Sequence, residues 1–305
     1  MKILVLSDSH IKTADRYGLC ELKIDKLTKI LAHWHEQISA VIVTGDLFDK
    51  REPYIPLVTK IAEILAGCHK PTYILSGNHD SIEREFHPLS PYIVGTGNHK
   101  IIGEEPLRIE NLILQGWNGG ATIPECNKGD VYFGHLNLAD CIGKGLTLEE
   151  LEATNYKRIF TGDLHDHFTK GKVTSIGCFP STFSDEGYVA SYLVYDTLGD
   201  TFEHFSLEFP RFVTVTVDGN NWENLDQVAG NIVRIKATYP CDKDAAVEKV
   251  LALRPHKFTR ITIKKNLVEQ EVTKLETLSP LEIITEEART QQWSEEQLTL
   301  ARENL

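Results

Sequence analysis

The chain begins MKILVLSDSH (residues 1–10), in which an apolar run is followed at once by Asp8 and His10. A short apolar run rich in β-branched residues predicts a buried strand. A carboxylate and an imidazole two positions apart can point the same way where such a strand breaks into a loop. This stretch therefore predicts the first strand of a sheet and part of a polar site at its end.

The same arrangement recurs along the first quarter of the chain. Apolar runs alternate with helical patterns, in the order helix at about 22–36, strand at 40–45, helix at about 56–66 and strand at 72–75. This strand–helix–strand repetition predicts an α/β domain. In open α/β sheets, ligands bind beyond the carboxyl ends of the strands. Polar residues stand directly after each expected strand, where such a site would form.

From about residue 99 the pattern changes to short strands separated by turns, at 112–116, 130–134, 158–161, 172–176, 190–196 and 201–206. We expect these strands to form a second sheet, mixed or antiparallel, that packs on the first. The fold class is therefore a two-sheet α/β sandwich, expected over residues 1–208.

Two smaller units follow the sandwich. Residues 211–265 predict a small α+β module, with strands at 212–217, 232–237 and 258–263 and helices at about 222–230 and 243–253. The tail, 266–305, contains two helix-capping boxes and predicts two short helices.

The composition limits the function. The net charge is −12, and the last forty residues carry nine Glu against three Lys or Arg. Half of the negative excess is therefore in the tail, which weakens the argument from charge against a nucleic-acid substrate. No apolar run reaches the length of a membrane span. The six Cys include no CxxC pair, so we expect reduced thiols and a cytoplasmic chain, bacterial or in a phage-infected host. Nucleotide-binding glycine motifs are absent as well.

Five short segments carry the chemical signal, and each follows an expected strand. They are Asp8-Ser9-His10, Gly45-Asp46, Gly77-Asn78-His79-Asp80, Gly134-His135 and Gly162-Asp163-Leu164-His165. Each segment alone is a weak signal, because single His and Asn residues at strand ends are usually structural. The ordered set is not expected by chance. Mixed His, Asp and Asn ligands suit a pair of divalent metals, which can activate a nucleophile and neutralise phosphoryl charge.

This order of motifs resembles the calcineurin-like metallophosphoesterase superfamily. More narrowly, it resembles the SbcD-type DNA repair and recombination nucleases and their bacteriophage counterparts, which work with an SMC-like ATPase that carries a long coiled coil. The resemblance covers about residues 1–200, and in looser form the rest of the chain. It implies the metallophosphoesterase fold, two bound divalent metals with Mn²⁺ favoured, and a capping role for the module at 211–265.

The resemblance also implies roles for individual residues. Asp8, His10 and His165 would hold the first metal, and Asp46 would bridge both. Asn78 and His135 would hold the second metal. His79 would be the general acid that helps the leaving oxygen depart, and Asp80 would orient His79 by hydrogen bonding.

Two positions depart from the family pattern. The family usually has a second His where Asp163 stands, and we expect Asp163 to serve as a harder ligand of the second metal. The alternative is a shifted register in which His165 and His167 are the pair. Asp49 stands where the cellular nucleases often carry His, and this is weak counter-evidence to the narrower resemblance.

Three functions remain open. The first is a Mn²⁺-dependent DNA exonuclease and endonuclease subunit, whose tail docks on the ATPase partner; a homodimer is also left open. The second is a phosphodiesterase or phosphatase for small substrates, which the acidic charge favours. The third is a scaffold that has lost its metals, which the retained ligand positions disfavour.

Overall fold

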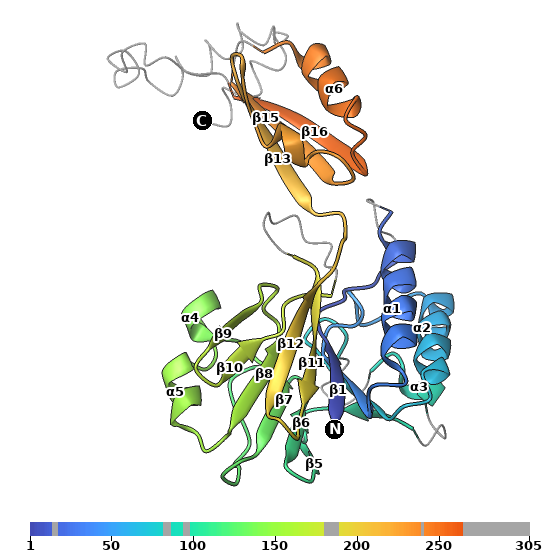
Figure 1. The fold of residues 1–305 in the computed structure, drawn as a ribbon, viewed down its shortest axis with the longest axis vertical. Helices are drawn as coiled ribbons and strands as arrows, with labels where there is room; N and C mark the ends of the chain where they lie inside the picture. Colours follow the sequence, from blue (N-terminus) through green and yellow to red (C-terminus); the bar gives the residue numbers. More distant parts are fainter. Residues whose placement is uncertain (14–17, 82–86, 94–97, 180–188, 239–240, 265–305) are drawn as a thin grey trace, which may run out of the picture.

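The computed structural model describes residues 1–13, 18–81, 87–93, 98–179, 189–238 and 241–264. The predicted tail helices, at 266–305, lie outside these residues. In the part of the chain that the structure describes, two six-stranded sheets face each other and form the sandwich, and a separate four-stranded sheet follows (Figure 1). Among the described helices, none is long and apolar enough to cross a membrane.

The first sheet has the strand order β12-β11-β1-β2-β3-β4. Its strands are β1 (Lys2–Leu6), β2 (Ala40–Thr44), β3 (Thr72–Leu75), β4 (His99–Ile102), β11 (Ser191–Asp196) and β12 (Thr201–Ser206). β1 to β4 are parallel, whereas β11 pairs antiparallel with β1 and β12 pairs antiparallel with β11.

The second sheet has the order β5-β6-β7-β8-β10-β9. Its strands are β5 (Leu107–Ile109), β6 (Leu112–Gln115), β7 (Val131–His135), β8 (Arg158–Gly162), β9 (Phe168–Lys170) and β10 (Val173–Ser175). β6, β7, β8 and β10 are parallel and the two edge strands are antiparallel, so the sheet is mixed. The expectation of a second, mixed sheet is confirmed.

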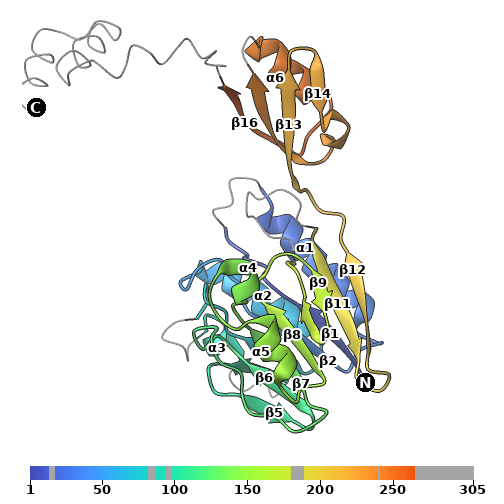
Figure 2. The ribbon, with the colours of Figure 1, turned by 90° about the vertical axis from the view of Figure 1, so that its left-hand side faces the viewer.

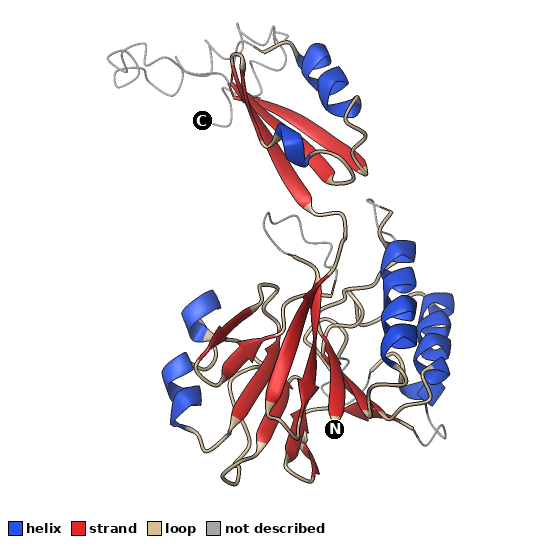
Figure 3. Ribbon diagram, viewed as in Figure 1, coloured by secondary structure: helices blue, strands red, loops and turns tan. Residues whose placement is uncertain are grey.

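Helices cover the outer faces of both sheets (Figures 2 and 3). On the first sheet they are α1 (Cys20–Trp34), α2 (Ile55–Gly67) and α3 (Ser90–Ile93), and on the second α4 (Ala139–Ile142) and α5 (Leu148–Ala153). Side chains alternate between the two faces of a strand. Leu4 and Leu6 accordingly pack under the helices, whereas Ile3 and Val5 pack against the second sheet. The result is the two-sheet α/β sandwich that the sequence predicts.

The sequence predicts that the strands at 190–196 and 201–206 belong to the second sheet. This prediction is wrong, because both strands extend the first sheet. β11 pairs antiparallel with β1, with Lys2 opposite Asp196. Both faces of β11 are apolar, because Tyr192 packs with the helices and Leu193 packs between the sheets. A strand buried on both sides fits beside β1 in the interior of a sheet, and its turn to β12 brings the next strand to the edge.

The third sheet has the order β14-β13-β15-β16 and is covered by α6 (Lys243–Leu251). Its strands are β13 (Phe212–Asp218), β14 (Asn221–Glu223), β15 (Ile232–Thr238) and β16 (Lys257–Lys264). The predicted helix at about 222–230 is wrong: this stretch contains β14 and a single 3₁₀ turn at Leu225–Gln227. Asn224 adopts φ of +62°, a left-handed conformation that interrupts a helix.

The third sheet lies beyond the carboxyl ends of the parallel strands of the sandwich (Figures 1 and 2). Contact between the two parts includes Leu19, at the start of α1, and Ile232, at the start of β15, and both are fully buried. The division of the chain at 208–211 and 265 stays a prediction, but this contact brings the third sheet to the end of the sandwich where the polar motifs lie.

Candidate metal centre

The strand ends of both sheets meet at one edge of the sandwich, and polar residues stand at five of these strand ends. Asp8 and His10 follow β1, Asp46 follows β2, Asn78 and His79 follow β3, His135 ends β7, and Asp163 and His165 follow β8. The sheets are joined here by a hydrogen bond from His135 Nδ1 to the carbonyl oxygen of Thr44, at 2.8 Å. The fold of the sandwich thus brings together, on one surface, residues that are far apart in the sequence.

Four of these residues have strained backbone conformations. The φ angles are +49° at Asp8, +43° at His10, +51° at Asp46 and +76° at Asp163. Residues with a Cβ rarely adopt positive φ, and such outliers cluster at functional sites. These conformations turn the backbone sharply after each strand, so that side chains from different strands can converge.

Two motif glycines make room for this convergence. A Cβ on Gly77 would collide with the carboxylate and backbone of Asp46, and a Cβ on Gly45 would collide with the ring of His135. Glycine is therefore required where one strand-end loop passes close to the next.

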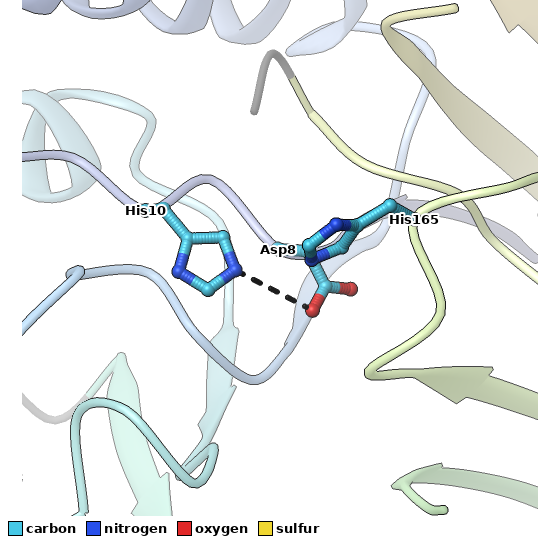
Figure 4. A group of neighbouring side chains, drawn as sticks. All are labelled: Asp8, His10 and His165. Atoms are coloured by element: carbon cyan, nitrogen blue, oxygen red, sulfur yellow. Dashed lines mark ion pairs between the residues drawn. The ribbon is translucent and has the colours of Figure 1, made fainter. Parts of the chain in front are cut away.

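The first group of candidate ligands contains Asp8, His10 and His165, whose ligand atoms lie within 4.8 Å of one another. Figure 4 shows their side chains converging from the loops after β1 and β8. His10 Nε2 lies 4.0 Å from Asp8 Oδ1. Two imidazoles and a carboxylate at this spacing are a suitable donor set for Mn²⁺, Fe or Zn²⁺.

The second group surrounds His135. Its Nε2 lies 2.9 Å from Asn78 Oδ1, 3.5 Å from Asp46 Oδ2 and 3.7 Å from Asp163 Oδ1. Because Nδ1 faces the Thr44 carbonyl and must donate there, a neutral ring presents a lone pair at Nε2. That lone pair faces three oxygen atoms. A divalent cation among these four atoms would convert a repulsive arrangement into coordination, so the residues fit a metal.

Asp46 lies between the two groups. Its Oδ2 is 3.7 Å from His10 Nε2 and 3.5 Å from His135 Nε2. Its Oδ1 accepts a hydrogen bond from the backbone amide of His79 at 2.8 Å, which fixes the carboxylate. This position is the one that a bridging ligand requires, while the bridging role itself stays a prediction.

The charges of the site also fit bound cations. Burial raises the pKa of Asp8 well above its usual range, and it does the same to Asp46, where repulsion from Asp80 adds to the effect. Burial likewise raises the pKa of Asp163. Buried carboxylates are costly without a compensating charge. Divalent ions would provide that charge and restore the ionised, ligating form.

Asp49 contacts His10 from the other side of its ring. Asp49 Oδ1 lies 3.6 Å from His10 Nδ1, and Asp49 Oδ2 accepts from Lys12 Nζ at 2.8 Å. A carboxylate on the far nitrogen of a ligating His fixes its orientation and tautomer. From the sequence alone, Asp49 stands out as a departure from the family pattern and has no predicted contact with a ligand. The position of Asp49 three residues after Asp46, in Gly45-Asp46-Leu47-Phe48-Asp49, is the signal in the sequence for this role.

His79 and Asp80 are arranged differently from the prediction. The Nδ1 of His79 lies 3.4 Å from the carbonyl oxygen of Asp49, and its ring centroid is 4.8 Å from that of His10. His79 therefore reaches the site. Asp80 has other partners: the hydrogen bonds described for it come from the backbone amides of Gly77, Leu47 and Phe48 and from the ring of His87.

Asp80 therefore supports the loops and has no described hydrogen bond to the His79 ring. Although burial acts to raise its pKa, His87 and the backbone donors outweigh this effect and lower the pKa of Asp80 below its ordinary value. An ionised Asp80 ties the loop after β2 to the loop after β3. His87, which is not among the predicted site residues, is fully buried as the partner of Asp80.

The two registers of the last motif lie in different places. Asp163 lies beside His135, and its backbone amide is 3.2 Å from both carboxylate oxygens of Asp8. His167 instead bonds to the carbonyl oxygen of Ser175 at 2.8 Å and stacks on His204, with ring centroids 3.6 Å apart. The geometry favours Asp163 over the shifted pair of His165 and His167.

Replacing Asp163 by Ala is therefore expected to weaken the binding of one divalent ion and to lower diester hydrolysis. Asp163→His should keep activity with a changed metal preference, because it replaces one donor by a softer one. Metal content and the rate with Mn²⁺, Mg²⁺ and Zn²⁺ measure both effects. His167→Ala is the matched control. If Asp163→Ala keeps wild-type metal content while His167→Ala loses metal, the shifted register is correct.

The chain belongs to the calcineurin-like phosphoesterase family, whose model matches residues 1–167. This range contains every predicted metal ligand and His79. The family uses divalent metals, and the clusters described above are candidates for holding them.

Among known proteins, the chain is 37% identical over 86 residues to a probable cyclic nucleotide phosphodiesterase of Rhodopseudomonas palustris. The match covers 27% of this chain and 31% of the relative, so the chain spans about a third of that protein's length. Similar solved structures include an archaeal phosphodiesterase (15% identity, TM-score 0.43, 68% of this chain and 100% of that chain) and a Pseudomonas putida nuclease (17%, 0.35, 67% and 87%). Likeness at these scores decides nothing about the substrate.

Proposed function

We propose that the protein is a Mn²⁺-dependent DNA nuclease subunit that cleaves phosphodiesters at the strand-end site. When bound, two divalent ions provide a nucleophilic oxygen at neutral pH and neutralise charge on the phosphoryl group. The protein's own residues contribute to cleavage by holding the reacting groups in position. Asp46 faces both ligand groups, and His79, outside the predicted ligand set, is available to donate a proton to the leaving oxygen.

The observation that supports a DNA substrate is the charge and position of the third sheet. Residues 211–264 carry nine Lys or Arg against six Asp or Glu, a net +3 within a chain of net −12. This positive unit contacts the sandwich through Ile232 and Leu19, at the end that holds the metal ligands. A small substrate needs no such unit, whereas a DNA backbone is attracted by one.

Three exposed cations lie at the end of the third sheet that is nearest to the sandwich. Arg211 precedes β13, and Lys257 begins β16 opposite Ile232. The carbonyl oxygen of Arg254 accepts a hydrogen bond from the backbone amide of Gly230. Because β13, β15 and β16 are parallel, all three residues lie at the same end as Ile232. We propose that they contact DNA phosphates on either side of the scissile bond.

A Mn²⁺-supplemented assay tests this proposal with labelled duplex DNA, hairpin DNA, cyclic nucleotides and bis-p-nitrophenyl phosphate. Changing Arg211, Arg254 and Lys257 together to Glu should reduce kcat/KM on DNA by more than about tenfold. The salt dependence of DNA binding should become flatter by about three in its logarithmic slope. Hydrolysis of bis-p-nitrophenyl phosphate should be unchanged, because that small substrate has no extended phosphate backbone for these cations to contact.

Two results would reject the nuclease. One is wild-type protein that cleaves cyclic nucleotides efficiently and DNA poorly. The other is a triple variant that cleaves DNA at the wild-type rate. A triple substitution with Lys26, which is partly exposed, and Lys29 and Lys60, which are exposed, all on α1 and α2 and all changed to Glu, controls for the loss of positive charge alone.

The second candidate is a phosphodiesterase for small substrates. The sequence match to a probable cyclic nucleotide phosphodiesterase favours it, and so does the acidity of the sandwich. The same substrate panel separates the two functions directly. The SMC-like ATPase partner remains part of the nuclease proposal, and the tail expected to dock on it lies outside the described residues.

A further inference from the structure

A lysine is buried beneath the loop Asp8-Ser9-His10, which is called the ligand loop below. Lys23 is in the first turn of α1, and only 1% of its surface is exposed. This is an unfavourable place for a cation, because a buried charge loses its hydration and the positive end of the helix dipole is close. A lysine held in such a position needs strong acceptors around its ammonium group.

The acceptors are backbone carbonyls of the ligand loop itself. Lys23 Nζ donates to the carbonyl oxygen of Ser9 at 2.6 Å and to that of His10 at 3.1 Å. Both carbonyls belong to the Asp8-Ser9-His10 motif. The lysine therefore contacts the backbone that carries two of the predicted ligands of the first metal, and does so from the helix side of the loop.

The amides of the same loop are held from the opposite direction. The amide of Asp8 donates to Gly45 O at 3.2 Å, and that of His10 donates to Asp46 O at 2.9 Å. The loop after β2 thus fixes the amides, and Lys23 fixes the carbonyls. Asp8 and His10 both have positive φ, a conformation that persists only when the surroundings determine it strongly.

We propose that Lys23 is a positioning residue for the first metal. By holding the carbonyls of Ser9 and His10, it keeps the strained loop in the one conformation that directs the Asp8 carboxylate and the His10 ring towards Asp46. The inference rests on the proposed function, since it requires Asp8 and His10 to bind metal.

Lys23→Met tests the inference, because Met keeps the length and apolar stem of Lys without its charge or its donors. Calorimetric titration of Mn²⁺ into the metal-free protein should show one of two ions bound about 10–100-fold more weakly, the usual effect of losing a group that orients a ligand. The Mn²⁺ concentration for half-maximal hydrolysis of bis-p-nitrophenyl phosphate should rise by the same factor. The kcat at saturating Mn²⁺ should stay near the wild-type value.

The matched control is Lys29→Met on the same helix. Lys29 is 70% exposed and pairs with Asp25 at 2.7 Å. Its loss removes the same charge from α1 without touching the ligand loop, so metal affinity should not change. Lys23→Arg keeps a cation and several donors and should restore part of the lost affinity.

A purely structural role predicts something different. In that case Lys23→Met lowers the unfolding temperature of the metal-free protein and leaves both Mn²⁺ affinities unchanged, which would overturn the inference. Lys23→Gln, a neutral variant that retains one donor group, provides a second test if the Met variant does not fold. It should weaken the same ion, and unchanged affinity in this variant also overturns the inference. Wild-type protein that binds no Mn²⁺ would instead reject the proposed function itself.

Discussion

Asp46→Asn is expected to abolish diester hydrolysis and to weaken the binding of both metal ions. The Oδ2 atom of Asp46 lies within 3.7 Å of ring nitrogens in both ligand groups. Asn keeps the shape of the side chain but loses its negative charge, and so it cannot serve two cations. Metal ions supply several kcal/mol of transition-state stabilisation, which corresponds to a loss of at least about 10³-fold in rate.

The measurement is metal content by mass spectrometry, together with the rate on bis-p-nitrophenyl phosphate at saturating Mn²⁺. Asp25→Asn, an exposed carboxylate on α1, controls for the loss of one negative charge. An Asp46→Asn protein that keeps both ions would remove Asp46 from the bridging position. Loss of one ion with the other retained would make it a ligand of a single metal.

His79→Ala is expected to keep both metals and to lose about 10²–10⁴-fold in turnover, the usual contribution of a general acid. The loss should depend on the leaving group. A nitrophenolate leaves without protonation, so hydrolysis of bis-p-nitrophenyl phosphate should fall least. A sugar alkoxide needs a proton, so cleavage of a dinucleotide or of DNA should fall most.

The main competing role for His79 is metal ligation, because its ring lies close to His10 and Asp46. Metal content separates the two roles. A His79→Ala protein that has lost an ion, with an equal loss of rate on both kinds of substrate, would make His79 a ligand. His87→Ala provides a contrast, because it should disturb the loops through Asp80 and show no leaving-group dependence.

The convergence of the site could be predicted from the sequence because it follows from topology. In parallel sheets, the residues after successive strands share one edge, so Asp8, Asp46 and Asn78 had to be neighbours once their strands were recognised. His135 and Asp163 come from the second sheet. Their approach depends on how the two sheets pack, which the ordered set of motifs indicated and strand patterns alone could not.

The supporting contacts could not be predicted in the same way. His135 is oriented by the backbone carbonyl of Thr44. Every residue has such a carbonyl, so the sequence does not indicate which one His135 contacts. Asp80 is tied to backbone amides and to His87, and not to the adjacent His79 that its position in the motif suggested. The placement of β11 beside β1 was missed because an apolar strand matches the interior of either sheet.

The account depends most directly on two ions that act together, and a Mn²⁺ titration of the metal-free wild-type protein tests this. The number of bound ions and the rate on bis-p-nitrophenyl phosphate are measured in the same samples. Two ions per chain should bind, hydrolysis should be absent after chelation, and the rate should return as the second ion binds. Full hydrolysis in the chelated protein, or a rate that saturates with a single ion, would contradict the two-metal site.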